Sequence, residues 1–205
     1  MKKSTFIYAA ALSVMAALPS ATMAVGFEAK AGVSSVRAAN DKAAVDAALA
    51  LDLRLERFFA FVPELNYQSI GFDVASGTVA TGTGITGAAT TSRTYHTFIP
   101  MANMRLYIPM GGEDVPAVQP YVTAGLGYGY SMYNQKNPDA NDSMSGFMYQ
   151  GMLGLQFNMG MLTEGSASST NLVLEAGYRG GQMEKSGVKF DWNGYVIRAG
   201  VNFQF

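Results

Sequence analysis

The chain has 205 residues, of which 49% are hydrophobic and only 14% are charged, and its formal net charge at pH 7 is −1. Ordinary soluble domains carry roughly 25% charged residues, so the composition departs from that class. The small net charge argues against nucleic acid or an anionic lipid surface as a partner. The absence of cysteine excludes a disulfide-stapled secreted domain and a lipoprotein anchored through an N-terminal cysteine.

Residues 1–24 have the three parts of a secretory signal peptide. Two lysines form the positive start, Phe6 begins an apolar segment, and a small-residue cleavage site ends at Ala24. We expect cleavage between Ala24 and Val25. A retained membrane anchor is the alternative, but the apolar segment is shorter than the ~20 residues of a spanning helix. The prediction is a signal peptide over 1–24 and one exported domain over 25–205.

Apolar and polar residues then alternate in successive segments, and this period of two is typical of a strand with one apolar and one polar face. The first segment covers residues 25–36 and the second covers 44–55. A tight turn at 56–58 leads to a third segment, from residue 59 to about 72. Pro63 lies within it and predicts a bulge or local break, because proline lacks the N–H of a ladder hydrogen bond.

The middle of the chain continues the alternation around a long loop. Residues 73–92 are rich in Gly, Thr and Ala and nearly free of charge, so we expect a loop into which the flanking strands extend part-way. The fourth segment, 94–108, has Tyr95 on its polar row, which predicts a bulge near Pro100 or a misplaced register. The fifth, 119–132, has a row of glycines that leaves room for bulky partners across a narrow lumen.

A second polar loop, 133–145, precedes three further segments. These cover residues 146–159, 170–179 and 189–205, with a loop at 180–187 before the last one. The last segment alternates from Tyr195 to the final residue, with only Val196 out of place. An apolar strand end is a liability in a soluble protein. In a membrane barrel it would instead pair with the first strand and have no free edge.

These segments number eight, and each has the ~9–11 residues that a tilted strand needs to cross a bilayer. An even count of strands with both ends on one side predicts an all-β fold, a transmembrane up-and-down antiparallel β-barrel. Residues 25–205 contain no uncharged apolar run of ~18 residues, which excludes helical membrane spans. A lipocalin-like soluble barrel, with its apolar rows inside, is the alternative.

The charges on the polar rows favour the membrane barrel, because a closed lumen must pair its charges. The acids are Glu28, Asp46, Asp52, Glu64 and Glu175, and the bases are Lys30, Arg54, Arg105, Arg179 and Arg198. The two sets are equal in number. We take the following residues as a candidate lumen charge network: Lys30, Asp52, Arg54, Glu64, Arg105, Glu175, Arg179 and Arg198.

Aromatic residues gather near the ends of the segments, as in the two girdles of an outer-membrane wall. One group comprises Phe58, Phe59, Phe203 and Phe205. The other comprises Tyr67, Phe72, Tyr128, Tyr130, Phe147, Tyr149, Tyr178, Phe190 and Trp192. A band of Leu, Val and Ala lies between them, so the apolar rows are predicted to face lipid.

The signal peptide, the eight amphipathic segments and the ending VIRAGVNFQF together resemble the small eight-stranded outer-membrane barrels of Gram-negative-type bacteria, the OmpA/OmpX-like porin family in the broad sense. The resemblance covers all of 25–205 and implies an outer-membrane location, contact with outer-membrane lipid and a monomer. It also implies that the terminal strand is read by the barrel assembly machinery, through Val201, Phe203 and Phe205. No periplasmic domain follows the barrel, so peptidoglycan anchoring is not expected.

No pattern in the sequence predicts a catalytic, cofactor or metal site. His96 is the only histidine, so a His-based metal site is not expected. A lipid-modifying barrel enzyme would need a base and a nucleophile near the rim, and His96 beside Thr94 and Ser92 is the sole candidate. The TGTGITG stretch lacks the lysine of a phosphate-binding loop.

We therefore expect a non-enzymatic outer-membrane barrel with a role in envelope integrity and in surface contacts. Loops 73–92 and 133–145 would carry any surface ligand, including an adhesion or host partner. The first alternative is a narrow channel for ions or very small solutes, since eight strands leave an interior that side chains just fill. The second is the lipid-modifying enzyme.

Overall fold

The computed structural model describes residues 24–80, 86–110, 117–133, 142–162, 170–185 and 187–205. Over 72–80 and 86–93 it describes the backbone alone. The predicted signal peptide lies outside the described residues except for Ala24, so its cleavage stays a prediction. The first strand begins directly afterwards, at Val25.

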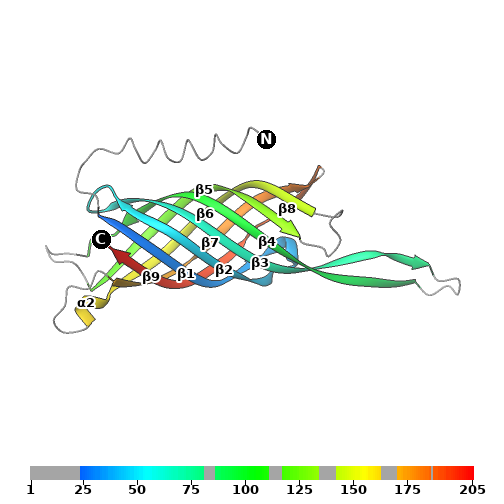
Figure 1. The fold of residues 1–205 in the computed structure, drawn as a ribbon, viewed down its shortest axis with the longest axis horizontal. Helices are drawn as coiled ribbons and strands as arrows, with labels where there is room; N and C mark the ends of the chain where they lie inside the picture. Colours follow the sequence, from blue (N-terminus) through cyan, green and yellow to red (C-terminus); the bar gives the residue numbers. More distant parts are fainter. Residues whose placement is uncertain (1–23, 81–85, 111–116, 134–141, 163–169, 186) are drawn as a thin grey trace.

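Eight long strands form a closed antiparallel barrel, and the predicted fold class is confirmed (Figure 1). The strands are β1 (Val25–Val36), β2 (Lys42–Arg54), β3 (Phe59–Ala80), β4 (Thr86–Tyr107), β5 (Val118–Tyr133), β6 (Asp142–Asn158), β7 (Thr170–Lys185) and β9 (Gly194–Gln204). A short strand β8 (Val188–Asp191), a 3-10 turn η1 (Arg37–Ala39) and a one-turn helix α2 (Met159–Leu162) complete the described elements. Among the described residues, no helix has the length and apolar character to cross a membrane.

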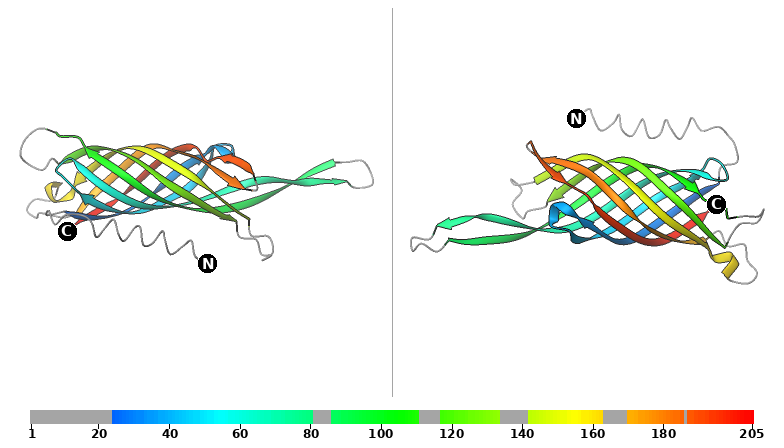
Figure 2. Two further views of the ribbon diagram at one scale, coloured as in Figure 1. Left: turned by 90° about the horizontal axis from the view of Figure 1, so that it is seen from above. Right: turned by 180° about the vertical axis from the view of Figure 1, so that it is seen from behind.

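Pairing of β1 with β9 closes the barrel, with Phe27 opposite Phe203 and Val33 opposite Ile197. The N–H of Phe205 donates to the carbonyl of Val25 at 2.9 Å, so the first and last strands meet at one end. We call this the termini end. The opposite end carries η1, β8 and the β3–β4 hairpin, and we call it the loop end (Figures 1 and 2).

The apolar rows face outward and the polar rows face the lumen, as predicted for a membrane barrel. Outward residues such as Leu153 and Ile197 are 67% and 61% exposed, whereas inward residues such as Glu28 and Arg105 are 0% and 1% exposed. A strand whose side chains alternate in this way buries its charges and displays its hydrocarbon. This arrangement suits an apolar solvent outside the wall and excludes the lipocalin-like alternative.

The β3–β4 hairpin is longer than the sequence predicted. Its strands stay paired as far as Ala80 and Thr86, with one register shift between Ser76 and Val79. Pairing of β3 with β2 stops at Ser69, and beyond the barrel the hairpin is a two-stranded ribbon that projects from the loop end (Figures 1 and 2). The prediction of a loop over 73–92 was wrong for most of its length, because the ladder begun in the barrel continues through these Thr- and Val-containing strands.

Of three further predictions about local geometry, the local break at Pro63 was right and the other two were wrong. The register around Pro100 is unbroken, and Tyr95 points into the lumen because the lumen is apolar at that level. At Pro63 the pairing with β2 is interrupted without a shift of register, so the local break was right and the bulge was wrong. The loop predicted over 180–187 was wrong for 180–185, which continue β7 and pair in part with β8.

Candidate functional site in the barrel lumen

The centre of the lumen holds one lysine among three carboxylates. The ammonium nitrogen of Lys30 lies 2.6 Å from a carboxylate oxygen of Glu64 and 3.1 Å from those of Glu28 and Glu175. All four side chains are at most 2% exposed. One ammonium cannot neutralise three carboxylates, so further cations must lie close by.

Two arginines supply the missing charge. Arg105 donates to Glu28 at 2.9 Å and to Glu175 at 3.4 Å. Arg198 donates to Glu175 at 2.8 Å and to Glu64 at 3.1 Å. Three cations and three carboxylates therefore form one bridged group that spans the barrel from wall to wall. We call it the ion cluster; its members are Glu28, Lys30, Glu64, Arg105, Glu175 and Arg198.

A layer of amides and one more ion pair extends the cluster toward the loop end. Arg179 donates to Asp46 and to Asn66, at 2.7 Å in each case. The amide of Gln150 donates to Glu64 at 3.1 Å, which ties this layer to the ion cluster. Hydrogen bonds of this kind hold the buried carboxylates and guanidinium groups in fixed positions.

Tyrosines cover the ion cluster on the side of the termini end. The hydroxyl of Tyr107 donates to Asp52 at 2.6 Å, and that of Tyr121 donates to Glu175 at 2.9 Å. The guanidinium of Arg54 lies over the Tyr107 ring, 4.4 Å from its centroid. The side chain of Arg54 is 23% exposed, and its Nε atom lies 3.8 Å from a carboxylate oxygen of Asp52.

The structure thus brings seven of the eight candidate lumen residues into one network and leaves Arg54 at its margin. It adds Glu28 and Asp46, which were predicted to face inward but were not among the eight candidate network residues. The sequence pattern could have identified Glu28 as a member of the network, because it lies two residues before Lys30 on the same inward row. Rows of period two identify the inward residues, but not which of them touch.

Above the ion cluster, toward the loop end, the lumen is filled mainly by apolar side chains, together with the hydrogen-bonded polar pairs Gln68–Ser34 and Thr97–Ser131. This apolar plug comprises Val36, Ala39, Ala44, Ile70, Tyr95, Ile99, Met101, Met144, Met148, Met183 and Trp192. The indole N–H of Trp192 donates to Gln68 at 2.7 Å, and the residue is 2% exposed. The prediction that Trp192 and Phe190 belong to an outer girdle was therefore wrong, since Phe190 also packs against the plug.

The glycine row of β5 makes room for larger side chains, as predicted. A Cβ placed on Gly129 would lie 2.3 Å from the terminal methyl carbon of Met183. One placed on Gly125 would overlap the amide oxygen of Asn103. Asn103 belongs to β4, which pairs with β5, and Met183 belongs to β7, which is two strands along the wall. The glycines therefore make room for side chains of nearby strands rather than for partners across the lumen.

The predicted assembly residues lie along the seam at the termini end. Val201 is opposite Ala29 and Phe203 is opposite Phe27 in the β1–β9 pairing. Phe203 is 38% exposed and Phe205 is 84% exposed, so both aromatic rings are accessible on the outer wall. Recognition of these residues by the barrel assembly machinery stays a prediction.

The only histidine lies on the outer wall, away from the lumen network. The ring nitrogen Nδ1 of His96 is 2.7 Å from the hydroxyl of Tyr67, and the two rings are stacked. Thr94 is exposed, and the side chain of Ser92 lies outside the described part of the structure. Among the described residues, no group of three or more His, Cys, Asp or Glu side chains is placed to hold a metal ion.

Comparison with known proteins bears on the fold. No family model and no curated protein sequence matches this chain. It is similar in structure to Neisserial surface protein A (NspA), with a TM-score of 0.57 and 13% identity over 90% of this chain and 98% of that one. It is also similar to Ail, the attachment invasion locus protein of Yersinia pestis, with a TM-score of 0.50 and 15% identity over 89% of this chain and 99% of that one.

At this level of identity the comparisons show the fold alone. Together with the apolar outer wall and the filled lumen, they define a small eight-stranded outer-membrane β-barrel. The resemblance read from the sequence is therefore confirmed at the level of fold.

Proposed function

We propose that this protein is a non-enzymatic outer-membrane barrel that makes surface contacts through its loop end and contributes to envelope integrity. The projecting β3–β4 hairpin is the observation that carries the proposal (Figure 1). The outer face of the wall would be covered by lipid, and the lumen is filled by the ion cluster and the apolar plug. The parts that remain available for a partner are those beyond the wall.

The hairpin has features of a contact element. Beyond Ser69 and Tyr95 its outer edges are not paired with β2 or β5, so each strand presents N–H and C=O groups to its surroundings. An extended segment of a partner can add to such an edge as a further strand. Only Asp73 and Arg93 are charged within 72–93, so little charge repulsion opposes such an approach.

One of the structurally similar barrels has been seen with a bound ligand. Ail was crystallised in complex with the heparin analogue sucrose octasulfate, which is a ligand of that protein. For this chain we propose that a surface ligand or an adhesion partner contacts the loop end.

Deletion of residues 78–91 tests the proposal. The deletion removes the outer part of the hairpin and leaves the barrel strands in place, so adhesion of cells bearing the protein to host cells or extracellular matrix should be lost. A matched variant replaces 78–91 by a Gly/Ser segment of the same length, and it should lose adhesion equally. A heat-dependent gel shift verifies that both variants are assembled. Unchanged adhesion in assembled variants would contradict the proposal.

A further inference from the structure

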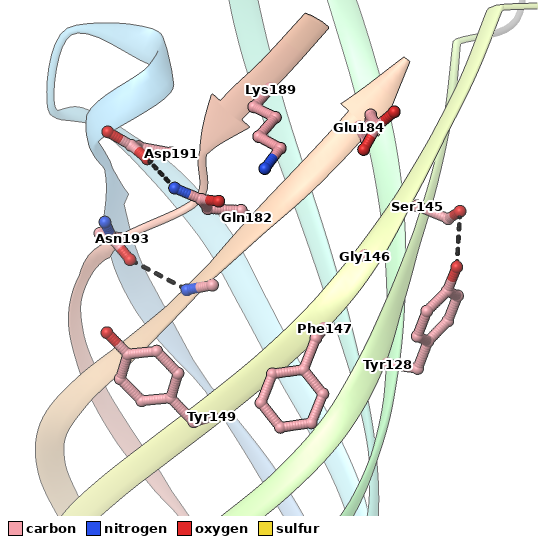
Figure 3. A pocket seen from close by; sticks show the side chains of 11 residues that line it. Tyr128, Ser145, Gly146, Phe147, Tyr149, Gln182, Glu184, Lys189, Asp191 and Asn193 are labelled. Atoms are coloured by element: carbon pink, nitrogen blue, oxygen red, sulfur yellow. Dashed lines mark hydrogen bonds between the residues drawn. The ribbon is translucent and has the colours of Figure 1, made fainter. Parts of the chain in front are cut away.

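A hollow of about 800 Å³ lies on the outer wall at the loop end, where β5, β6, β7 and β8 come together (Figure 3). Three aromatic residues line its lower part: Tyr128, Phe147 and Tyr149. Five polar residues line its upper part: Gln182, Glu184, Lys189, Asp191 and Asn193. The hollow therefore joins an aromatic surface to a polar rim.

The aromatic part presents its rings outward. Tyr128, Phe147 and Tyr149 are 54%, 56% and 43% exposed. They continue an outward row that further down the same wall consists of residues such as Leu126 and Leu153. Aromatic rings in this position mark the level at which the hydrocarbon of a bilayer gives way to headgroups. The lower part of the hollow thus lies at the lipid interface.

The polar rim is built by the β7–β8 pairing, which places Lys189 opposite Glu184 and Asp191 opposite Gln182. The amide of Gln182 donates to Asp191 at 3.4 Å, and the Asn193 side-chain oxygen accepts the N–H of Gly181 at 2.9 Å. In the described part of the chain, neither Lys189 nor Glu184 takes part in an ion pair. Donors and acceptors are therefore left free to face the hollow (Figure 3).

These groups match a sugar ring. Exposed aromatic faces pack against the C–H faces of a pyranose, while amides, carboxylates and an ammonium group exchange hydrogen bonds with its hydroxyls. The rim carries two carboxylates and one cation, Glu184, Asp191 and Lys189, so a polyanionic ligand is disfavoured. A neutral or amino sugar fits this balance of charge.

The position of the hollow decides how the sugar is presented. Short turns of outer-membrane barrels face the periplasm and longer connections face outward, so the loop end with its long hairpin meets the outer leaflet. The hollow opens onto the apolar wall below it, where acyl chains would lie against Leu126 and Leu153. We propose that the hollow binds the saccharide headgroup of a glycolipid in the outer leaflet.

The protein contains its own reporter for this site. Trp192 is its only tryptophan, and it stands between Asp191 and Asn193, which both line the hollow. The backbone N–H of Trp192 donates to the backbone carbonyl of Gly181 at 2.9 Å, so this residue is tied to β7 directly behind the rim. Occupation of the hollow should therefore change the fluorescence of this buried indole.

The experiment uses residues 25–205 refolded in phosphatidylcholine vesicles, with a neutral glycolipid that carries a one- or two-hexose headgroup on a diacylglycerol added in increasing amounts. A saturable change of Trp192 fluorescence is expected. The glycolipid concentration at the midpoint of this change should rise at least about tenfold in Tyr149→Ala and in Asp191→Asn. Tyr149→Phe keeps the ring and should stay close to the unaltered protein. The control Tyr195→Ala removes a ring that is exposed on the outer wall and does not line the hollow, so it should leave the midpoint unchanged.

Each possible result decides the matter. Equal midpoints in all variants would show that the glycolipid coats the wall at large, and the proposal would fail. Binding of a soluble, deacylated saccharide with the same midpoint as the intact glycolipid would overturn the assignment to lipid. Adhesion through 78–91 is measured separately, so the failure of one proposal leaves the other standing.

Discussion

Lys30 is the residue on which the charge balance of the lumen depends most. It contacts three buried carboxylates, and the next cations, Arg105 and Arg198, each already serve two of them. Removing one member of a buried ion group leaves its partners charged without compensation, which costs more than the intact group contributes. Substitution of Lys30 is therefore expected to lower the free energy of unfolding strongly, and substitution of an exposed lysine only slightly.

Replacing Lys30 by methionine should lower the free energy of unfolding by about 3–5 kcal/mol, because Glu28, Glu64 and Glu175 would share two cations instead of three. Urea unfolding of the barrel refolded in vesicles measures the change. Lys42→Met, at the exposed start of β2, is the control and should change it by less than about 0.5 kcal/mol.

A second substitution separates charge from shape. Adding Glu64→Gln to Lys30→Met removes one of the uncompensated carboxylates, so the double variant should be more stable than the sum of the single changes implies. Strictly additive losses would mean that Lys30 acts through packing alone, and the ion cluster would then not be an energetic unit.

At the scale of the element, period-two alternation was sufficient to predict most of the wall. The range 25–36 coincides with β1, and the inward rows of all eight strands were assigned to the correct face. The alternation succeeds because one face of each strand meets lipid and the other meets a packed lumen. Where neither face is under that constraint, as in the projecting β3–β4 ribbon, the pattern fades and the strand was missed.

Trp192 shows a different kind of error. Counting back in twos from Arg198 places Val196, Gly194 and Trp192 on the inward row, and the structure agrees. Trp192 was assigned to the girdle by its residue type, because a lumen polar throughout leaves no place for an indole ring. Toward the loop end the charged groups of the lumen give way to the apolar plug. The plug could not be read from one strand, because its members come from several strands around the barrel.

The seam between β1 and β9 offers a test at this scale. A Cβ on Gly32 would lie 2.0 Å from the carbonyl oxygen of Ile197, so Gly32→Ala should push the two strands apart. We expect a clear drop in the heat-modifiable, closed form after refolding. Gly151→Ala is the matched control, because a Cβ there meets no atom within 4 Å, and it should fold as well as the unaltered chain. Equal yields of the closed barrel from Gly32→Ala and Gly151→Ala would show that the β1–β9 seam tolerates a side chain at position 32.

The whole molecule is a barrel whose lumen is closed twice. The ion cluster joins opposite walls through contacts such as Lys30–Glu64 and Arg105–Glu28. The apolar plug, with Trp192 and Met148 at 2% and 0% exposure, fills the lumen toward the loop end. An ion would have to displace charged partners at one level and enter a hydrocarbon environment at the other.

The refolded protein should therefore show no steady single-channel conductance in planar bilayers. Arg105→Ala should remain silent as well, because it disturbs the ion cluster but leaves the apolar plug in place. Combining Arg105→Ala with Trp192→Gly weakens both barriers and should produce intermittent conductance, provided that a gel shift shows a folded barrel. Conductance in the unaltered protein that changes on Arg105→Ala would instead support the narrow channel. Its selectivity would then be set by the charges of the ion cluster rather than by the loops.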